Sequence, residues 1–191
     1  MKTSKSITAL FLLLLPILSH AQFKNRLSIG PRAGLNFATV DAESAKRVTG
    51  LAAGITSTYS INEGSGVSVD LLYSAEGYEQ GGIEYDLNYF KIPLAYNVFF
   101  GSLGEKFRPK VYLGLVPGFL LNAEVNGTDV ADQYTSTTFD ALGGLGFNYR
   151  LASRIWLNTD LRFYLGLNDI SETTSIKNQN IQFTLGVAYG I

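Results

Sequence analysis

The sequence has no cysteine, one histidine and one methionine among its 191 residues. Without cysteine, the chain can form no disulfide framework, no thiolate nucleophile and no cysteine-built zinc site. Charged residues are also scarce, at 16%, against roughly 25% in an ordinary soluble protein. The formal net charge is −1. Because no basic surface is indicated, we expect no nucleic-acid partner.

The first segment has the pattern of a secretory signal peptide. Lys2 and Lys5 are followed by the apolar stretch 7–18, and small residues at positions 19 and 21 define a cleavage site before Gln22. A transmembrane helix would need about 20 apolar residues, and this stretch is shorter. We therefore expect a signal peptide over residues 1–21 and a single mature domain over residues 22–191.

Cleavage at that site would also remove the lone histidine, His20. A mature chain with neither histidine nor cysteine excludes a Ser-His-Asp triad, a Cys-His pair and an ordinary zinc site. Only paired carboxylates, or a serine with a lysine, remain for catalysis. We therefore expect a protein that is not an enzyme and that has no cofactor and no metal centre.

The mature chain alternates between apolar and polar or small residues from end to end. In the last segment Ile181, Phe183, Leu185 and Val187 alternate with polar or small residues, which is the period of a strand with one apolar face. No segment shows a strong helical period. The same pattern predicts eight strands, over residues 27–37, 51–61, 67–76, 89–100, 110–121, 139–150, 155–167 and 181–191.

Each of these strands is about as long as the 9–11 residues that a tilted strand needs to cross a bilayer. The links roughly alternate between long and short, although link 101–109 interrupts the rhythm. Links 62–64 and 151–153 are short, 79–86 is longer and 122–136 is the longest. The pattern predicts an all-β fold, an eight-stranded antiparallel up-and-down transmembrane β-barrel in the outer membrane. We expect a monomer embedded in outer-membrane lipid, with both termini in the periplasm.

A soluble barrel such as a lipocalin-like carrier is the alternative, with its apolar face turned inward. Two features favour the membrane barrel. The polar faces carry many small residues and few charges, which suits a narrow interior. Aromatic residues also gather near the strand ends, as in interfacial girdles. One predicted rim contains Tyr59, Phe100, Phe147, Tyr149 and Tyr189, and the other contains Phe37, Phe90, Phe119 and Phe139.

Four segments resemble a known family. They are GPRAGLNF at 30–37, DLLYS at 70–74 followed by Gly77, LNYFKIPL at 87–94, and FD at 139–140 with GLG at 144–146. Together they resemble the small outer-membrane β-barrel family labelled porin family or PorT-like, from Gram-negative bacteria. The resemblance implies an eight-stranded barrel, mostly without an assigned activity. One branch of that family is linked to a protein-secretion apparatus.

The C-terminus resembles the signal that barrel-assembly machinery reads during biogenesis. Its pattern is a polar residue, a glycine and two hydrophobic residues, here Thr184, Gly186, Tyr189 and Ile191. Many bacterial barrels end in phenylalanine, whereas this chain ends in isoleucine. The resemblance implies the assembly machinery as a partner during biogenesis.

The alternation places charged side chains on the inner face. The predicted lumen cluster comprises Arg32, Asp70, Glu76, Lys91, Asp140, Arg150, Asp160 and Arg162. We place Arg32, Asp70 and Asp160 near mid-depth, and Glu76, Lys91, Asp140 and Arg162 nearer the outer rim. Unpaired buried charge is expensive, so these groups should pair and fill the lumen. The functional alternative is a gated ion path, or a carboxylate pair for acid–base chemistry.

We expect a structural or interaction role through the external loops, chiefly 122–136, with a protein partner there. A narrow porin-like channel for small solutes and a membrane-embedded enzyme are the alternatives. Asn126–Thr128 matches a glycosylation sequon, but Asn-Gly is also a turn signal, and we favour the turn. Glu124, Asp129 and Asp132 in that loop could hold a divalent cation, but we favour simple solvation.

Overall fold

The computed structural model describes residues 26–171 and 175–191. The signal peptide expected over residues 1–21 lies outside the described residues. The strands are β1 (Leu27–Val40), β2 (Lys46–Ser60), β3 (Ser65–Gln80), β4 (Ile83–Lys91), β5 (Leu94–Phe99), β6 (Phe107–Val125), β7 (Thr128–Asp129), β8 (Thr137–Arg150), β9 (Ile155–Gly166) and β10 (Asn178–Gly190). A short 3-10 turn, η1, spans Ala131–Gln133. Among the described residues, no helix is long and apolar enough to cross a membrane.

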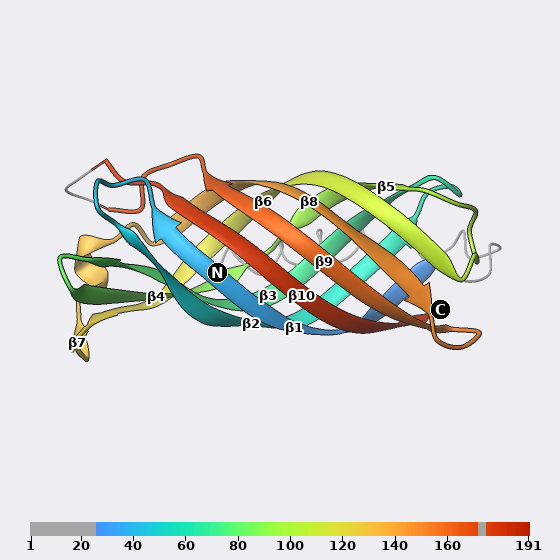
Figure 1. Ribbon diagram of the computed structural model, residues 1–191, viewed down its shortest axis with the longest axis horizontal. Helices are drawn as coiled ribbons and strands as arrows, with labels where there is room; N and C mark the ends of the chain where they lie inside the picture. Colours follow the sequence, from blue (N-terminus) through green and yellow to red (C-terminus); the bar gives the residue numbers. More distant parts are fainter. Residues whose placement is uncertain (1–25, 172–174) are drawn as a thin grey trace, which may run out of the picture.

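The strands close into an antiparallel ring of eight (Figure 1). β4 and β5 together occupy one position in this ring, and β7 lies outside it. β1 pairs with β2 on one side and with β10 on the other, which joins the two ends of the chain. The ring continues through β3, the β4–β5 wall, β6, β8 and β9 back to β10. This architecture confirms the predicted eight-stranded antiparallel up-and-down barrel. Among the described residues, closure pairs each strand of the ring on both sides, which leaves the ring without an open edge.

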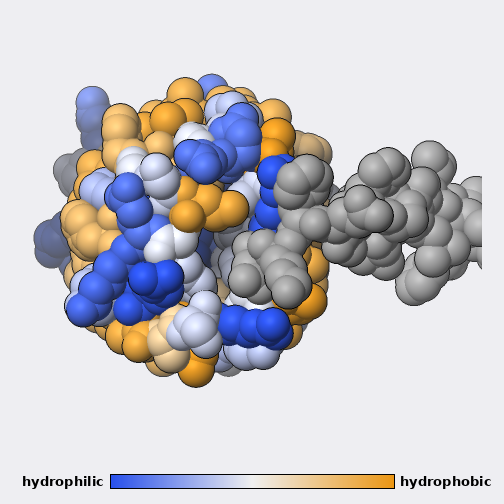
Figure 2. Space-filling model, turned by 90° about the vertical axis from the view of Figure 1, so that its right-hand side faces the viewer, coloured by the Kyte–Doolittle hydropathy of each residue, from blue (hydrophilic) through white to orange (hydrophobic). Residues whose placement is uncertain are grey.

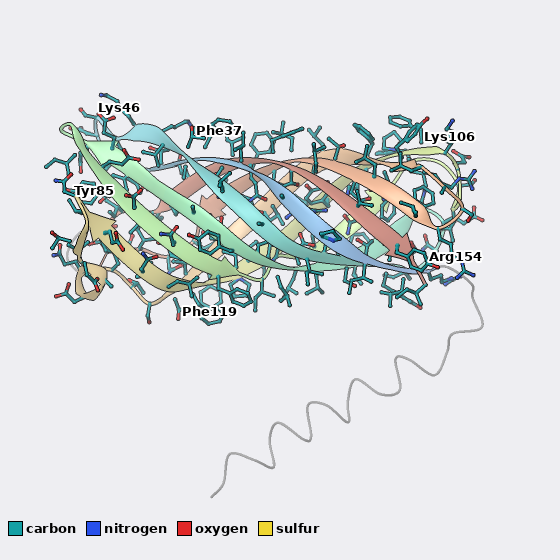
Figure 3. All side chains as sticks on the ribbon, turned by 90° about the horizontal axis from the view of Figure 1, so that it is seen from below. Phe37, Lys46, Tyr85, Lys106, Phe119 and Arg154 are labelled. Carbon is teal, nitrogen blue, oxygen red and sulfur yellow. The ribbon has the colours of Figure 1, made fainter. Side chains whose placement is uncertain are left out.

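The apolar face of the barrel points outward. On β10 the outward side chains Phe183, Leu185, Val187 and Tyr189 are 42–49% exposed, while Thr184 between them is buried. Phe37 and Phe119 likewise project outward from the wall (Figure 3). A soluble carrier needs the opposite arrangement, with apolar side chains around an internal cavity. The observed faces therefore exclude the inside–outside arrangement that the lipocalin-like alternative requires.

The fourth predicted strand is divided into β4 and β5 at Ile92 and Pro93. Proline has no N–H to donate to a ladder, so regular pairing stops there. The wall nevertheless stays closed by backbone hydrogen bonds, because Asp70 donates to the Pro93 carbonyl at 3.0 Å and Ile92 donates to the Pro117 carbonyl at 2.9 Å.

The longer link predicted over 79–86 is wrong. β3 and β4 pair until Gln80 faces Ile83, and only Gly81 and Gly82 connect them. Their φ angles are +61° and +83°. Both glycines therefore adopt the left-handed conformation of a two-residue type I′ hairpin turn. The Asn126–Gly127 turn is confirmed, since it joins β6 to β7 with φ angles of +51° and +76°.

The two ends of the barrel differ. One end, named the turn end, holds the short links 61–64, 100–106 and 151–154 and lies on the right of Figure 1. Arg26, the first described residue, and the C-terminal Ile191 also lie at this end. The other end, named the loop end, holds links 41–45, 81–82, 126–136 and 167–177, with β7 on the left of Figure 1.

Candidate functional site

Five charged side chains meet in the middle of the lumen and form the central cluster: Arg32, Asp70, Lys110, Asp160 and Arg162. Arg32 lies 3.3 Å from Asp70 and 2.9 Å from Asp160. Arg162 contacts the same oxygen of Asp70 at 2.6 Å, and Lys110 contacts Asp160 at 2.9 Å. The five residues come from β1, β3, β6 and β9, so their ion pairs connect walls on several sides of the barrel.

A second group, the loop-side cluster, consists of Glu76, Lys91 and Asp140. The Lys91 ammonium lies 2.8 Å from each of the two carboxylates. It also lies 5.3 Å and 5.2 Å from the ring centroids of Tyr89 and Tyr164, within cation–π range. Lys91 is 1% exposed. The two carboxylates around it supply the opposite charge that offsets the cost of burying an ammonium group this deeply.

The two clusters balance each other's charge. The central cluster has three cations and two anions, while the loop-side cluster has one cation and two anions. The excess positive charge of one therefore cancels the excess negative charge of the other, and the ion-paired lumen is neutral. A neutral, mutually paired set is the arrangement that offsets the cost of burying charge.

A chain of hydrogen bonds joins the two clusters through β9, β10 and β1. Arg162 donates to the Tyr164 hydroxyl at 3.3 Å, and Tyr164 donates to Gln182 at 3.0 Å. Gln182 donates to Asn36 at 2.8 Å, Asn36 to Ser74 at 2.9 Å, and Ser74 to Glu76 at 2.7 Å. Asn178 and Asn180 also donate to Glu76. The lumen is therefore one connected polar network.

Glycine allows an aromatic ring to lie against the inner wall beside this network. A Cβ atom added at Gly144 would lie 2.3 Å from the ring of Tyr112, which pairs with it across β6 and β8. The ring in turn lies 5.5 Å from the Lys110 ammonium and 5.8 Å from the Arg162 guanidinium. Gly144 therefore makes room for the Tyr112 ring on the inner face of the barrel.

An apolar cap closes the loop end above the loop-side cluster. Its buried members are Val40, Tyr78, Leu87, Tyr89, Ala123, Tyr134 and Ile170. Two links contribute to it: the Tyr134 hydroxyl lies 2.9 Å from that of Tyr78, and the backbone N–H of Thr135 donates to the carbonyl of Ile170 at 2.9 Å. Burial raises the pKa of Tyr134, so its phenol stays neutral against the cap. Tyr134 and Ile170, one from each of the two longest links, therefore lie over the loop end of the lumen.

The structure brings seven of the eight predicted charged residues into the two clusters. Arg150 lies apart, half-buried at the turn end, and makes no ion pair with any described residue. Arg162 was expected nearer the outer rim but reaches Asp70 in the central cluster. Its long side chain bridges the difference in depth. Lys110 was missed, although it stands on the polar face of its strand, because it begins the segment next to a predicted link.

The four predicted assembly-signal residues all lie on or directly after β10. Thr184 and Gly186 are buried on the inner face, whereas Tyr189 and Ile191 are exposed on the outer face at 49% and 59%. Their role in biogenesis stays a prediction. In the loop after β6, Asp129 accepts a hydrogen bond from the backbone of Ala131 at 2.9 Å at the start of η1. Among the described residues, no three acidic side chains gather closely enough to hold a metal ion.

Comparison with known families gives a match over most of the chain. Residues 20–172 match the family described as outer membrane protein beta-barrel domain. The chain belongs to this family. Its apolar exterior, its closed ring of strands and this match together place the protein in the outer membrane. The narrower PorT-like resemblance stays a prediction. A comparison with curated protein sequences gives no match.

Solved structures share the barrel at low sequence identity. The crystal structure of Neisserial surface protein A has a TM-score of 0.64 at 15% identity and covers 89% of this chain and 100% of that one. The outer membrane protein OprG from Pseudomonas aeruginosa gives 0.58 at 15%, covering 88% and 97%. The attachment invasion locus protein Ail of Yersinia pestis, in complex with the heparin analogue sucrose octasulfate, gives 0.50 at 13%, covering 86% and 99%. These likenesses establish the fold of the outer-membrane barrel.

Proposed function

We propose that this outer-membrane barrel is a closed, non-enzymatic monomer that acts through contacts at its loop end. The observation that carries the proposal is the lumen, where paired charges from several walls fill the interior at two depths. Eight-stranded barrels have an interior that side chains just about fill. Such an interior supports a structural role and leaves the ends of the barrel as the surfaces that meet other molecules.

The loop end is the end proposed to face outward, with the turn end in the periplasm. Outer-membrane barrels place their short turns in the periplasm and their longer loops outside, and links 126–136 and 167–177 are the long ones here. The cap supports an interaction role because Tyr134 and Ile170 are buried in it and anchor residues 130–136 and 167–171 to the barrel. A preorganised surface loses less conformational entropy when it binds a partner.

The charge of the loop end indicates the kind of partner. The described residues of the loop end include nine carboxylates and three cations. The carboxylates are Asp41, Glu43, Glu79, Glu84, Asp86, Glu124, Asp129, Asp132 and Asp169, and the cations are Lys46, Arg47 and Lys177. Complementary charge steers association and suppresses partners of the wrong sign. The proposed partner is a protein with a positively charged surface.

A narrow channel is the second candidate function, but the paired side chains that fill the lumen argue against it. The membrane-embedded enzyme is weaker still. Its two candidate carboxylates, Asp140 and Asp160, are both buried and ion-paired. A general acid or base must reach a substrate proton within hydrogen-bond distance, directly or through one water. Neither group is presented to a substrate in this arrangement.

The absence of cysteine gives a clean test of orientation and contact. Glu43→Cys places a thiol at the exposed loop end, and Ser102→Cys places one at the exposed turn end. A membrane-impermeant maleimide should label Glu43→Cys on intact cells and Ser102→Cys only after lysis. A thiol-anchored cross-linker should then trap a neighbouring protein from the loop-end variant alone. Labelling in the reverse order, or no loop-end adduct, would refute the proposal.

Liposome swelling separates the closed barrel from the channel. Proteoliposomes containing the purified protein are diluted into isotonic solutions of small sugars and amino acids. A closed lumen predicts swelling no faster than in protein-free liposomes. Swelling rates that fall with increasing solute size would instead establish the channel and overturn the proposal.

A further inference from the structure

The turn end has the opposite charge balance to the loop end. Its described charged residues are Arg26, Lys106, Arg108, Arg150 and Arg154 against Glu63 and Glu105. Seen from this side, an apolar rim surrounds a polar centre (Figure 2). Lys106 and Arg154 lie at this extremity of the barrel (Figure 3). The central cluster lies deeper in the lumen, so these cations form a separate basic mouth.

Two adjoining pockets open in this mouth. The first, of about 40 Å³, is lined by Arg108 and by polar side chains that include Ser28, Thr58, Asn148 and Asn158. The second, of about 200 Å³, is lined by Arg150, Arg154 and Ser153. Both share Leu103, Trp156 and Gly190, so they form one depression against the indole of Trp156. Among the described residues, no carboxylate lines either pocket.

Arg108 is held in place but keeps bonding capacity. The side chain is 3% exposed, its Nη2 donates to the carbonyl of Glu63 at 2.5 Å, and its guanidinium lies 4.5 Å from the ring centroid of Phe99. Its Nε has no hydrogen-bond partner among the described residues, and neither does the buried Oδ1 of Asn148 in the same pocket. Both atoms are therefore free to hydrogen-bond to a polar molecule that enters the pocket.

We propose that this mouth is a binding site for an anionic sugar, a saccharide ring that carries a carboxylate or a phosphate. Guanidinium groups bind both kinds of anion with paired hydrogen bonds, and Arg108, Arg150 and Arg154 supply three of them. The indole face of Trp156 offers an apolar platform for the ring, with polar side chains such as Asn148 and Ser28 for its hydroxyls. The depression is smaller than the roughly 300–1,000 Å³ of sites for drug-sized ligands, which fits a single ring.

Tryptophan fluorescence reports on this site directly, because Trp156 is the only tryptophan in the sequence. The purified barrel in detergent micelles is titrated with glucuronate, glucose 6-phosphate, glucose and inorganic phosphate while tryptophan emission is followed. Isothermal calorimetry on the same samples detects binding that leaves the emission unchanged. We expect saturable binding of glucuronate or glucose 6-phosphate, with the tighter of the two identifying the acid group, and much weaker binding of glucose.

Variants locate the site. Arg150→Gln and Arg154→Gln should each weaken the binding of the charged sugar by about tenfold, the loss of one charge-assisted contact. Arg47→Gln removes an exposed arginine at the loop end and should leave binding unchanged. Equal binding of inorganic phosphate and glucose 6-phosphate would reveal an adventitious ion only and overturn the proposal. So would equal binding of glucose and the charged sugars, or no binding by either method.

Discussion

Replacing Lys91 with methionine should destabilise the barrel strongly. Methionine keeps much of the side-chain volume but removes the cation that lies 2.8 Å from both Glu76 and Asp140. At 2.8 Å and an effective dielectric constant of about 20, each attraction is worth about 6 kcal/mol. The ammonium also loses hydration on burial, which offsets much of this gain. Breaking a buried ion pair costs about 3–5 kcal/mol, and Lys91→Met leaves two buried carboxylates without their cation.

The assay is denaturant unfolding of the protein refolded into lipid vesicles, followed by the emission of Trp156. Lys46→Met is the matched control, because Lys46 pairs with Glu79 at 2.7 Å in a largely exposed position and should contribute about 0–1 kcal/mol. Lys91→Met with Asp140→Asn should recover much of the stability, since Glu76 keeps hydrogen bonds from Ser74, Asn178 and Asn180. If Lys91→Met unfolds at the same denaturant concentration as Lys46→Met, the charge-balance reasoning is refuted.

Three further changes test other parts of the structure. Gly144→Val should lower the free energy of unfolding by about 1–3 kcal/mol, because the added side chain overlaps the Tyr112 ring; wild-type stability in the same vesicle assay would argue against the packing described. Leu113→Arg, at the most exposed apolar position of the wall, should cost about 2–4 kcal/mol near the bilayer midplane, with Leu113→Ala as control; equal stability of the two variants would contradict a lipid-facing Leu113. Tyr134→Ala should loosen the cap and speed protease cleavage within 126–136, whereas Tyr134→Phe should loosen it less; cleavage at the wild-type rate in both would show that Tyr134 does not hold the link.

The period-two pattern predicts the barrel well where the wall meets lipid. Along β10, lipid outside and a polar lumen inside impose opposite demands on successive residues, so Thr184 and Leu185 reveal their faces in sequence alone. The burial of Arg32, Asp70 and Asp160 follows from the same alternation. These features depend only on which side of the wall each residue occupies.

The pattern fails beyond the apolar belt. At the loop end, the inward-facing side chains of Tyr78 and Leu87 are buried in the apolar cap, so the inner face is no longer polar and the polar–apolar alternation no longer marks β3 and β4. Only the glycine pair at 81–82 reveals their hairpin. The contact of Tyr134 with Tyr78 joins segments 56 residues apart and leaves no local signal. The ion-pair partners of Arg162 and Lys110 could not be predicted either, because the partner of a long side chain depends on how neighbouring strands are staggered along the barrel.

The most direct test of a sealed outer-membrane barrel is electrical recording across a planar lipid bilayer. The purified protein is inserted under an applied voltage, and Lys91→Met and Arg32→Gln are recorded beside the wild type. The filled, charge-balanced lumen predicts no steady unitary current from the wild-type barrel. Stable unitary currents from the wild type, abolished by boiling the sample, would contradict the account and establish the channel.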